Sequence, residues 1–527
     1  MRLIPITIEV KSNHDCFDIL IAAICNWKNV DYRMVFCESW GFVYESIKDN
    51  SFIISNNLST GRGDEFSYLK NYHGIDIKKV DINNEDISPA ISKEIMNNSP
   101  VMLKVDVFNC PWMFNHYKIQ HASHYIIING YDEKTKKYNA IDNQMAINGA
   151  EFPENDLIDA CKEIYIIRAG YETIDINTKD ILRNAVDRLT DNEGNYLLGK
   201  RLEIFCVDLI NYMNLDEEVK NDKSEPSTAL LFQLIKQIGS GRYKFSLALE
   251  YIQNVKKDLQ MDYVIEMLKD VSIKWNEVLG MLIKAYFLKS REKMYSRIHL
   301  KLMDIISFEE DIVRNIIRLI NEEVNYDNYD LEPRVCEALN PVDYKYVDIK
   351  EYLNNNGVYK EESIYCNAEL SNPSRYFVPK FNIENSEIHK GMFKFKINNF
   401  MNDEFDNLIC EGQEIKLDID GYDKLLILTC SEFGNFDEKI EIFYDNNEKE
   451  IISFKTSTWL STITREENEL IFLGKGVSRR DENVNVYPFD VSLHANYYNL
   501  KNQENKIIKI KLPDCINIHI FAITFAK

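Results

Sequence analysis

The sequence predicts a multidomain α+β protein, on the basis of its length and of two changes in hydrophobic pattern. Its 527 residues exceed what one hydrophobic core usually holds. Short β-rich runs fill the first third, a helical period takes over near Asn177, and strand patterns return near Val347. We therefore expect a mixed α/β domain over residues 1–172, a helical domain over 173–328 and a β-sandwich over 345–527.

The first domain is expected to begin with a helix and to continue as strands. Asn13 and Asp15 are good N-cap residues, and they precede an apolar stripe with helical spacing that begins at Ile19. This places Cys16 in the first helical turn. The expected strands are FIIS (52–55), VMLKVDVF (101–108), HYIIINGYD (124–132), KYNAID (137–142) and EIYIIRA (163–169).

A helical bundle is expected from residue 177 to about 325. Its clearest stripe begins at Trp275 and continues at i+3, i+4, i+7, i+8 and i+11 to Tyr286. Residues 326–343 are typical of a linker. The later strands LLILTC (425–430), KIEIFY (439–444), KIIKIKL (506–512) and INIHIFAITFA (516–526) have no helical pattern between them, which favours a β-sandwich.

The charge balance excludes several classes of partner. The formal net charge of −22 argues against nucleic-acid binding and against an anionic membrane surface. No apolar run reaches the ~18 residues that a membrane span needs, and the N-terminus has no signal-peptide pattern. Eleven cysteines without a CxxC pair favour reduced thiols, so we expect a cytoplasmic protein.

Three residues in one chain order predict nucleophilic chemistry. At a helix start, the macrodipole and free N–H groups favour the reactive thiolate of Cys16. A thiolate nucleophile needs a base and a group that orients the base. His124 opens a strand, and a turn at DEKTKK would place Asp142 of the next strand beside it. Cysteine, histidine and then Asp or Asn is the order of papain-like enzymes.

Three stretches carry a resemblance to a known family. They are HDCFDILIAAICNW (14–27), ESWGFVY (38–44) and VDVFNCPWMFNHYKIQHASHYIIINGYD (105–132). Through them residues 1 to about 325 resemble the butirosin biosynthesis protein H family, whose fold is papain-like and related to the C39 peptidases. The resemblance implies an acyltransferase of natural-product biosynthesis that takes an acyl or aminoacyl group from a carrier-protein thioester and passes it to an amine.

Carried over by position, the resemblance assigns roles to this sequence. Cys16 would be the nucleophile, His124 the base and Asp142 the orienting residue, with Asn143 as a rival for the third role. The partners would be an acyl or peptidyl carrier protein and an amine acceptor. No cofactor of the chain's own is implied, because the phosphopantetheine arm belongs to the carrier.

One departure from the papain and C39 pattern concerns the oxyanion hole. Those enzymes use a Gln a few residues before the cysteine, and residues 9–14 of this chain contain none. The backbone N–H of Cys16, with the side chain of Asn13 or His14, is the alternative.

Several other residues are candidates for binding substrate, or for the core. His121 is expected in a pocket or beside the catalytic residues, and Asp106 or Glu38 to bind a cationic amine. Trp40, Phe42 and Tyr44 alternate as an acyl pocket or core packing would require. The spacing of His116, His121 and His124 does not fit one strand face, so no metal site is predicted.

The C-terminal region resembles a jelly-roll, galactose-binding-like domain. The similar stretches are VDIKEYLNNNGVY (347–359), NLICEGQEIKLDIDGYDKLLIL (407–428), FKTSTWL (454–460) and KLPDCINIHIFAIT (511–524). A fold does not give a function, so we assign no sugar binding.

Two rival functions remain open. A cysteine peptidase, amidase or thioesterase would use the same triad but release free acid. A non-catalytic scaffold would dock a carrier without turnover. The sequence also leaves a homo-oligomer open.

Overall fold

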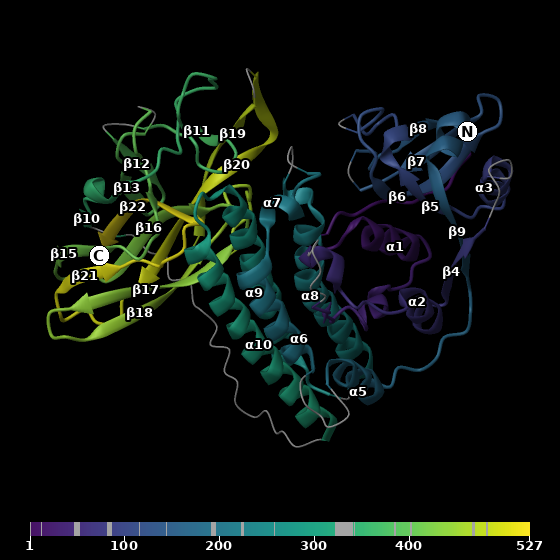
Figure 1. Cartoon of the computed structure of the whole chain (residues 1–527), viewed down its shortest axis with the longest axis horizontal. Coiled ribbons are helices and arrows are strands. Elements are labelled where there is room, and N and C mark those ends of the chain that lie inside the picture. Colours follow the sequence, from purple (N-terminus) through teal and green to yellow (C-terminus); the bar gives the residue numbers. More distant parts are fainter. Residues whose placement is uncertain are drawn as a thin grey trace.

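The computed structural model describes residues 2–527 except residues 12, 47–52, 82–86, 115, 144, 191–196, 223–225, 258, 322–340, 342, 384–385, 401–402, 466–468 and 481–482. Long helices occupy the middle of the molecule, with an N-terminal α/β region on one side and a β-rich C-terminal region on the other (Figure 1). The linker predicted at 326–343 lies almost entirely outside the described residues. The three domain ranges stay predictions.

The N-terminal region is built on one antiparallel sheet of seven strands in the order β4-β9-β5-β6-β7-β8, with β1 paired to β6. The strands are β1 (Arg2–Leu3), β4 (Ile75–Val80), β5 (Val101–Asp106), β6 (Ser123–Asp132), β7 (Lys137–Ile141), β8 (Ala150–Pro153) and β9 (Cys161–Ala169). A separate pair is β2 (Val43–Tyr44) and β3 (Leu58–Ser59). The helices are α1 (Cys16–Trp27), α2 (Glu65–His73), α3 (Ile87–Met96) and α4 (Glu154–Ala160).

Four of the five strands predicted here are confirmed, and one is wrong. The run at 52–55 does not form a strand where it is described, because Ile54–Asn57 make a 3-10 turn. The Glu218 carboxylate accepts hydrogen bonds from this turn instead, from the Ile54 N–H at 2.6 Å and from the Ser55 N–H at 3.4 Å. The predicted hairpin is present, since β6 and β7 pair antiparallel with Ile127 opposite Ile141.

The predicted helical region is confirmed. Its helices are α5 (Thr178–Leu189), α6 (Leu197–Tyr212), α7 (Leu215–Glu218), α8 (Leu230–Lys256), α9 (Asp262–Phe287) and α10 (Glu292–Asn321). The stripe that begins at Trp275 lies in α9 and faces the core, with Trp275, Val278 and Leu282 fully buried. Burial of such a face provides most of the stability of a helix in a protein.

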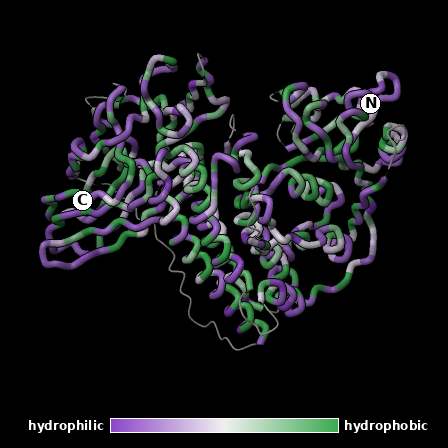
Figure 2. Tube along the Cα trace, viewed as in Figure 1, coloured by the Kyte–Doolittle hydropathy of each residue, from purple (hydrophilic) through white to green (hydrophobic). Residues whose placement is uncertain are grey.

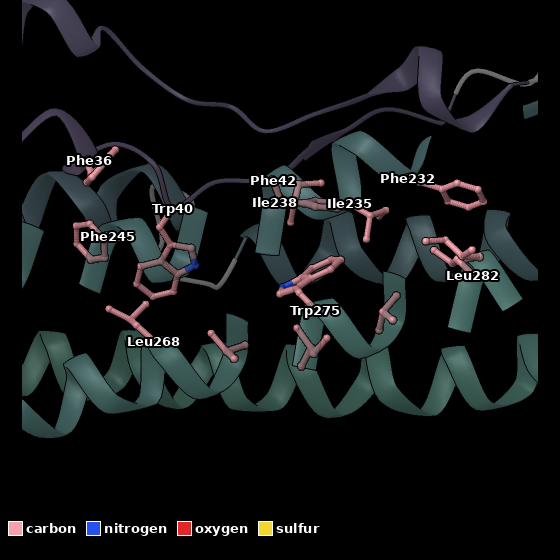
Figure 3. Close-up of a cluster of buried hydrophobic side chains, with 14 of the residues drawn as sticks. Phe36, Trp40, Phe42, Phe232, Ile235, Ile238, Phe245, Leu268, Trp275 and Leu282 are labelled. Atoms are coloured by element: carbon pink, nitrogen blue, oxygen red, sulfur yellow. The ribbon is translucent and has the colours of Figure 1, made fainter. Parts of the chain in front are cut away.

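The core of the helical region continues into the N-terminal region. Figure 3 shows Trp40 and Phe42 from the chain before β2 among side chains of α8 and α9, with the Trp275 ring beside them. The ring centroids of Phe42 and Trp275 are 5.9 Å apart, and those of Trp40 and Phe245 are 5.7 Å apart. The helices therefore share a core with the N-terminal region.

The C-terminal region is an antiparallel β-sandwich. One sheet has the order β10-β22-β16-β20-β19-β11, with β14 also on β22, and the other has the order β15-β21-β17-β18. The strands are β10 (Tyr344–Tyr346), β11 (Arg375–Pro379), β12 (Glu387–Lys390), β13 (Phe393–Lys396), β14 (Leu408–Ile409), β15 (Glu414–Ile419), β16 (Lys424–Ser431), β17 (Phe436–Tyr444), β18 (Lys449–Thr456), β19 (Glu469–Arg480), β20 (Asn483–Asn499), β21 (Ile507–Lys511) and β22 (Ile518–Ala526). The β-sandwich prediction is confirmed.

Hydrophobic residues recur along the central helices and are interrupted by hydrophilic ones (Figure 2). Within the described ranges, no helix combines the length and apolarity that crossing a membrane requires.

Candidate active site

Cys16 is the first residue of α1, as the sequence predicts. A capping box starts the helix: the Asp15 carboxylate accepts the Asp18 N–H, and the Asp18 carboxylate accepts the Asp15 N–H, both at 3.0 Å. This fixes the direction of the first turn, in which Cys16 is a half-buried residue.

The thiol ionises less readily than the helix-start argument predicted. Burial and the neighbouring Asp15 carboxylate raise the pKa of Cys16, while hydrogen bonds from the backbone N–H groups of Tyr125 and Phe17 lower it. The balance is a pKa above the usual value for cysteine, because the negative charge of Asp18 adds to the first two effects. Cys16 is consequently a thiol at neutral pH, and its attack needs a base.

His124 lies at the start of β6, directly before Tyr125, whose ring packs on Phe17 of α1 with centroids 5.1 Å apart. It sits opposite Val105 of β5 and is buried, with 5% of its surface exposed. Burial lowers the pKa of His124 and the Asp142 charge only partly restores it, so the ring is neutral at pH 7. A neutral imidazole is the form that accepts a proton.

Asp142 follows β7 and faces the His124 ring. The distance from His124 Nε2 to Asp142 Oδ2 is 3.9 Å, longer than a hydrogen bond. Within the described part of the chain, Nε2 has no hydrogen-bond partner. The predicted hairpin thus brings these two side chains together, and a small approach would close the hydrogen bond.

The Asp142 carboxylate is held in place by three donors. Trp112 Nε1 donates to Oδ2 at 2.6 Å, and the backbone N–H groups of Met145 and Ala146 donate to Oδ1 at 2.9 and 3.1 Å. Sequence reasoning gave Trp112 no role, although the Pro111–Trp112 turn stands out in the stretch before His124. Only the fold shows that this indole reaches Asp142.

The two candidates for the oxyanion hole or its support, Asn13 and Asn143, differ in their surroundings. Asn13 is exposed and has a left-handed backbone with φ 61°. Asn143 follows Asp142, and within the described residues its buried Oδ1 has no hydrogen-bond partner. The oxyanion assignment stays a prediction for both.

His121 and Asp106 pair with one another. His121 Nδ1 lies 2.8 Å from Asp106 Oδ2, and its ring stacks on Phe108 with centroids 4.3 Å apart. Burial raises the pKa of Asp106, but the His121 hydrogen bond, the Phe108 N–H and the Lys162 charge outweigh it and hold the pKa below its usual range. Since these groups already satisfy the carboxylate, Asp106 does not offer an amine acceptor a free charge.

Of the two alternatives for Trp40, an acyl pocket or core packing, its surroundings favour core packing. Trp40 has 2% of its surface exposed, and its Nε1 donates to Glu309 Oε2 of α10 at 3.0 Å. Phe42 and Tyr44 are buried as well, with the Tyr44 hydroxyl on Asp208 at 2.9 Å. The alternation of these residues reflects packing against the helices. Glu38 is also engaged, since it accepts the Tyr68 hydroxyl at 3.0 Å.

A cavity of about 840 Å³ opens between α8, the segment that precedes α1, and the chain at and just after the end of α1. Its lining is mostly polar: Glu9, Lys11, His14, Asn26, Asn29, Val30, Asp31, Tyr32, Arg33, Tyr243 and Leu247. His14 Nε2 and the Tyr32 hydroxyl lie 3.0 Å apart at its wall. Cys16 is not among the lining residues, so this cavity does not surround the sulfur.

In the described residues, no three His, Cys, Asp or Glu side chains converge as metal ligands would. His116 influences His124 by charge, which lowers the pKa of His124 further. The absence of a resident metal or cofactor stays an expectation.

Two families of known proteins match parts of the chain. Residues 16–143 match butirosin biosynthesis protein H, N-terminal, and residues 380–527 match an AziU2-like beta-sandwich domain. The resemblance of the N-terminal region and the expected C-terminal β-sandwich are thereby confirmed, while the galactose-binding likeness stays a prediction. No curated protein matches the chain. The first match begins at Cys16 and ends one residue after Asp142, so it spans all three candidate residues.

Proposed function

We propose that this chain is a biosynthetic enzyme of a natural-product pathway, an acyltransferase that uses Cys16 as its nucleophile. The observation that carries the proposal is the meeting of three chain segments. Cys16 begins α1, and the ring of the next residue, Phe17, packs on Tyr125 of β6 with centroids 5.1 Å apart. His124 precedes Tyr125, and His124 Nε2 faces Asp142 at 3.9 Å. The name of the matched family, a butirosin biosynthesis protein, supports a biosynthetic role.

The first half-reaction forms an acyl-enzyme. The donor is the thioester of an acyl or aminoacyl group on the phosphopantetheine arm of a carrier protein. Cys16 Sγ attacks the thioester carbonyl while His124 takes the thiol proton through Nδ1, the ring nitrogen that does not face Asp142. The carrier thiol leaves with that proton, and the Cys16 thioester remains.

Electrostatics make this order of steps reasonable. Cys16 rests as a thiol and His124 as a neutral ring, so proton transfer accompanies the attack. The imidazolium that forms gains the Asp142 charge, which three donors hold in place. The Cys16 backbone N–H, with Asn13, His14 or Asn143, would stabilise the oxyanion.

The second half-reaction forms the amide. The amine acceptor attacks the Cys16 thioester, loses a proton to His124, and releases the Cys16 thiol, which takes that proton back. Transfer rather than hydrolysis requires that the amine be oriented and water kept out. Asp106 and Trp40 already have partners in His121 and Glu309.

Several further proposals follow from this function. The catalytic region would have a papain-like fold, with the cysteine at a helix start and the histidine on a central strand. The partner would be a carrier protein with its phosphopantetheine arm, and the chain would need no cofactor of its own. We place the enzyme in the cytoplasm, where carrier-bound thioesters are made.

Intact-protein mass after mixing with acyl thioesters tests the proposal. Wild-type protein should gain one acyl mass, and the gain should vanish in Cys16→Ala. Cys161→Ala is the matched control, because Cys161 is the other partly exposed described cysteine of this region, and this variant should still acylate. Adding an amine should remove the acyl group and yield the amide.

Each other outcome has a defined meaning. Loss of the acyl group in buffer alone, with free acid as product, would indicate a hydrolase. Acylation that persists in Cys16→Ala would contradict the assignment of the nucleophile. No acylation by thioesters on a carrier or on free pantetheine would favour a scaffold.

A further inference from the structure

Two carboxylates flank the proposed nucleophile. Asp15 is the N-cap of α1 and Asp18 is its third residue, so Cys16 lies between them in sequence. Asp18 is fully buried, and a buried carboxylate needs a partner of opposite charge. Both negative charges act on the Cys16 thiol.

The partner comes from the helical region. Lys244 Nζ of α8 lies 3.1 Å from Asp15 Oδ2 and 2.5 Å from Asp18 Oδ2, and only 4% of its side chain is exposed. Arg62, from the chain before α2, adds a second cation at 2.9 Å from Asp18 Oδ1. Lys244 is thus the group that contacts both carboxylates from another structural region.

The position of Lys244 is fixed by the packing of α8. Gly241 approaches the chain so closely that a Cβ there would lie 2.3 Å from the Ser39 carbonyl oxygen. One residue later, Arg242 donates to the Gly41 carbonyl at 2.7 Å and pairs with Glu309 in full burial. Lys244 follows within the same turn, so it has little freedom to leave the two carboxylates.

We propose that Lys244 is a positioning residue of the Cys16 site, through which the helical region holds the first turn of α1 and offsets the negative charge beside the thiol. The inference rests on the proposed role of Cys16. It gives the helical region a part in the reaction, since without α8 the nucleophile would face two carboxylates with Arg62 alone. Lys244 itself touches no reacting atom.

Charged groups around the thiol come from several elements, and all of them bear on a pH profile. They are Asp15 and Asp18 of α1, Arg62, Glu65 of α2, Lys244 of α8, His124 of β6, His116 and Asp142. Substitution of Lys244 removes one of the two cations that neutralise Asp15 and Asp18, so the thiolate should form at higher pH.

The test is the rate at which iodoacetamide alkylates Cys16, followed by peptide mass from pH 7.5 to 9.5. In Lys244→Met we expect alkylation at pH 8.5 to be about 3- to 10-fold slower, a shift of the profile by roughly 0.5 to 1 pH unit. Lys244→Arg should restore most of the rate. Lys236→Met is the matched control, an exposed lysine of the same helix, and should leave the profile unchanged.

A second variant tests the inference if Lys244→Met does not fold. Lys244→Met leaves Asp18 buried with Arg62 as its cation, so the double variant Lys244→Met/Asp18→Asn removes both charges. In this double variant, the alkylation rate of Cys16 should rise at the same pH as in wild type or at a lower pH. A Lys244→Met profile that keeps the wild-type pH dependence, or a double variant shifted upward like a single one, would overturn the inference.

Alkylation needs no acyl donor, so the two proposals can fail separately. A shifted profile without any acyl-enzyme would contradict the acyltransferase and keep the role of Lys244. An acyl-enzyme together with an unshifted alkylation profile would support the acyltransferase and contradict the role of Lys244.

Discussion

At the residue scale, two carboxyl groups near the start of α1 have pKa values shifted in opposite directions: Asp18 of α1 and Glu65 of α2. Burial raises the pKa of Asp18, yet Lys244 and Arg62 bring it down to about 2. Burial also raises the pKa of Glu65, and burial together with the Asp18 and Asp15 charges outweighs the opposing charge of Arg62, so the pKa reaches about 7. Lys244 and Arg62 therefore keep Asp18 ionised, while Glu65, which also pairs with Arg62, keeps its proton until near neutral pH.

This arrangement predicts a pH-dependent difference between wild type and Glu65→Gln. A raised pKa means that the contribution of Glu65 to stability is full below about pH 4.5 and is lost as the pH rises through about 7. The variant resembles the protonated group. It should match wild type at pH 4.5 and exceed its free energy of unfolding by about 2–3 kcal/mol at pH 8.

Urea unfolding at both pH values measures this difference. A gap between variant and wild type that is the same at pH 4.5 and pH 8 would show that Glu65 does not titrate in this range.

At the element scale, α8 is the helix that joins the helical region to the proposed site. Its glycines allow close approach: a Cβ on Gly239 would lie 2.8 Å from Trp275 Cβ, and one on Gly241 would meet the Ser39 backbone. The buried Glu309 carboxylate accepts hydrogen bonds from the indole N–H groups of Trp40 and Trp275 and forms an ion pair with Arg242. Small residues let the backbones meet, and the buried ion pair fixes their register.

Gly241→Ala should therefore destabilise the protein, although alanine favours helices. The new methyl group cannot move away from a backbone oxygen, so we expect a loss of about 1–3 kcal/mol in the free energy of unfolding. Urea denaturation followed by circular dichroism checks this. Lys236→Ala on the exposed face of α8 should change stability by less than about 0.5 kcal/mol. A Gly241→Ala protein as stable as this control would mean that α8 is not packed so closely.

At the scale of the whole molecule, the β-sandwich docks on α9 through buried polar contacts. Lys284 pairs with Glu432 and donates to Asn372 at 3.0 Å, while Asn517 donates to the Gly280 carbonyl at 3.2 Å. Burial raises the pKa of Glu432, but Lys284 and His519 overcome this and keep it below its usual range. The Glu432 carboxylate thus depends on the helical region for its lysine partner. Within the sandwich, its ion-pair partner is His519, at 3.5 Å.

Lys284→Met should weaken this docking. Removal of one partner of a buried ion pair costs about 3–5 kcal/mol, because the other charge stays buried. We expect a lower urea midpoint and faster thermolysin cleavage, and recovery of most stability in Lys284→Met/Glu432→Gln. Lys289→Met, at an exposed lysine near the end of α9, is the control. Equal stability of Lys284→Met and the control would argue against a docked sandwich.

The sequence by itself determined the classes of structure and the order of the candidate residues. Periodicity predicted the helical region and the sandwich strands, because a buried face imposes a repeat of 3.6 or 2 residues on the chain. The capping residues before Cys16 and the turn after His124 are local signals, so the start of α1 and the β6–β7 hairpin were predictable as well.

Only the tertiary structure decided which charges and rings meet. From the sequence, Trp40 and His121 were both candidates for a pocket. In the fold, Trp40 donates a hydrogen bond to Glu309, and His121 pairs with Asp106. The hydrogen bond from Trp112 to Asp142 joins residues 30 positions apart in the chain. The ion pair between Lys244 and Asp18 joins residues 226 positions apart. The pKa of Cys16 rises because burial and two carboxylates act together on it. These effects depend on distance in space and on loss of water, and neither follows a repeat along the chain.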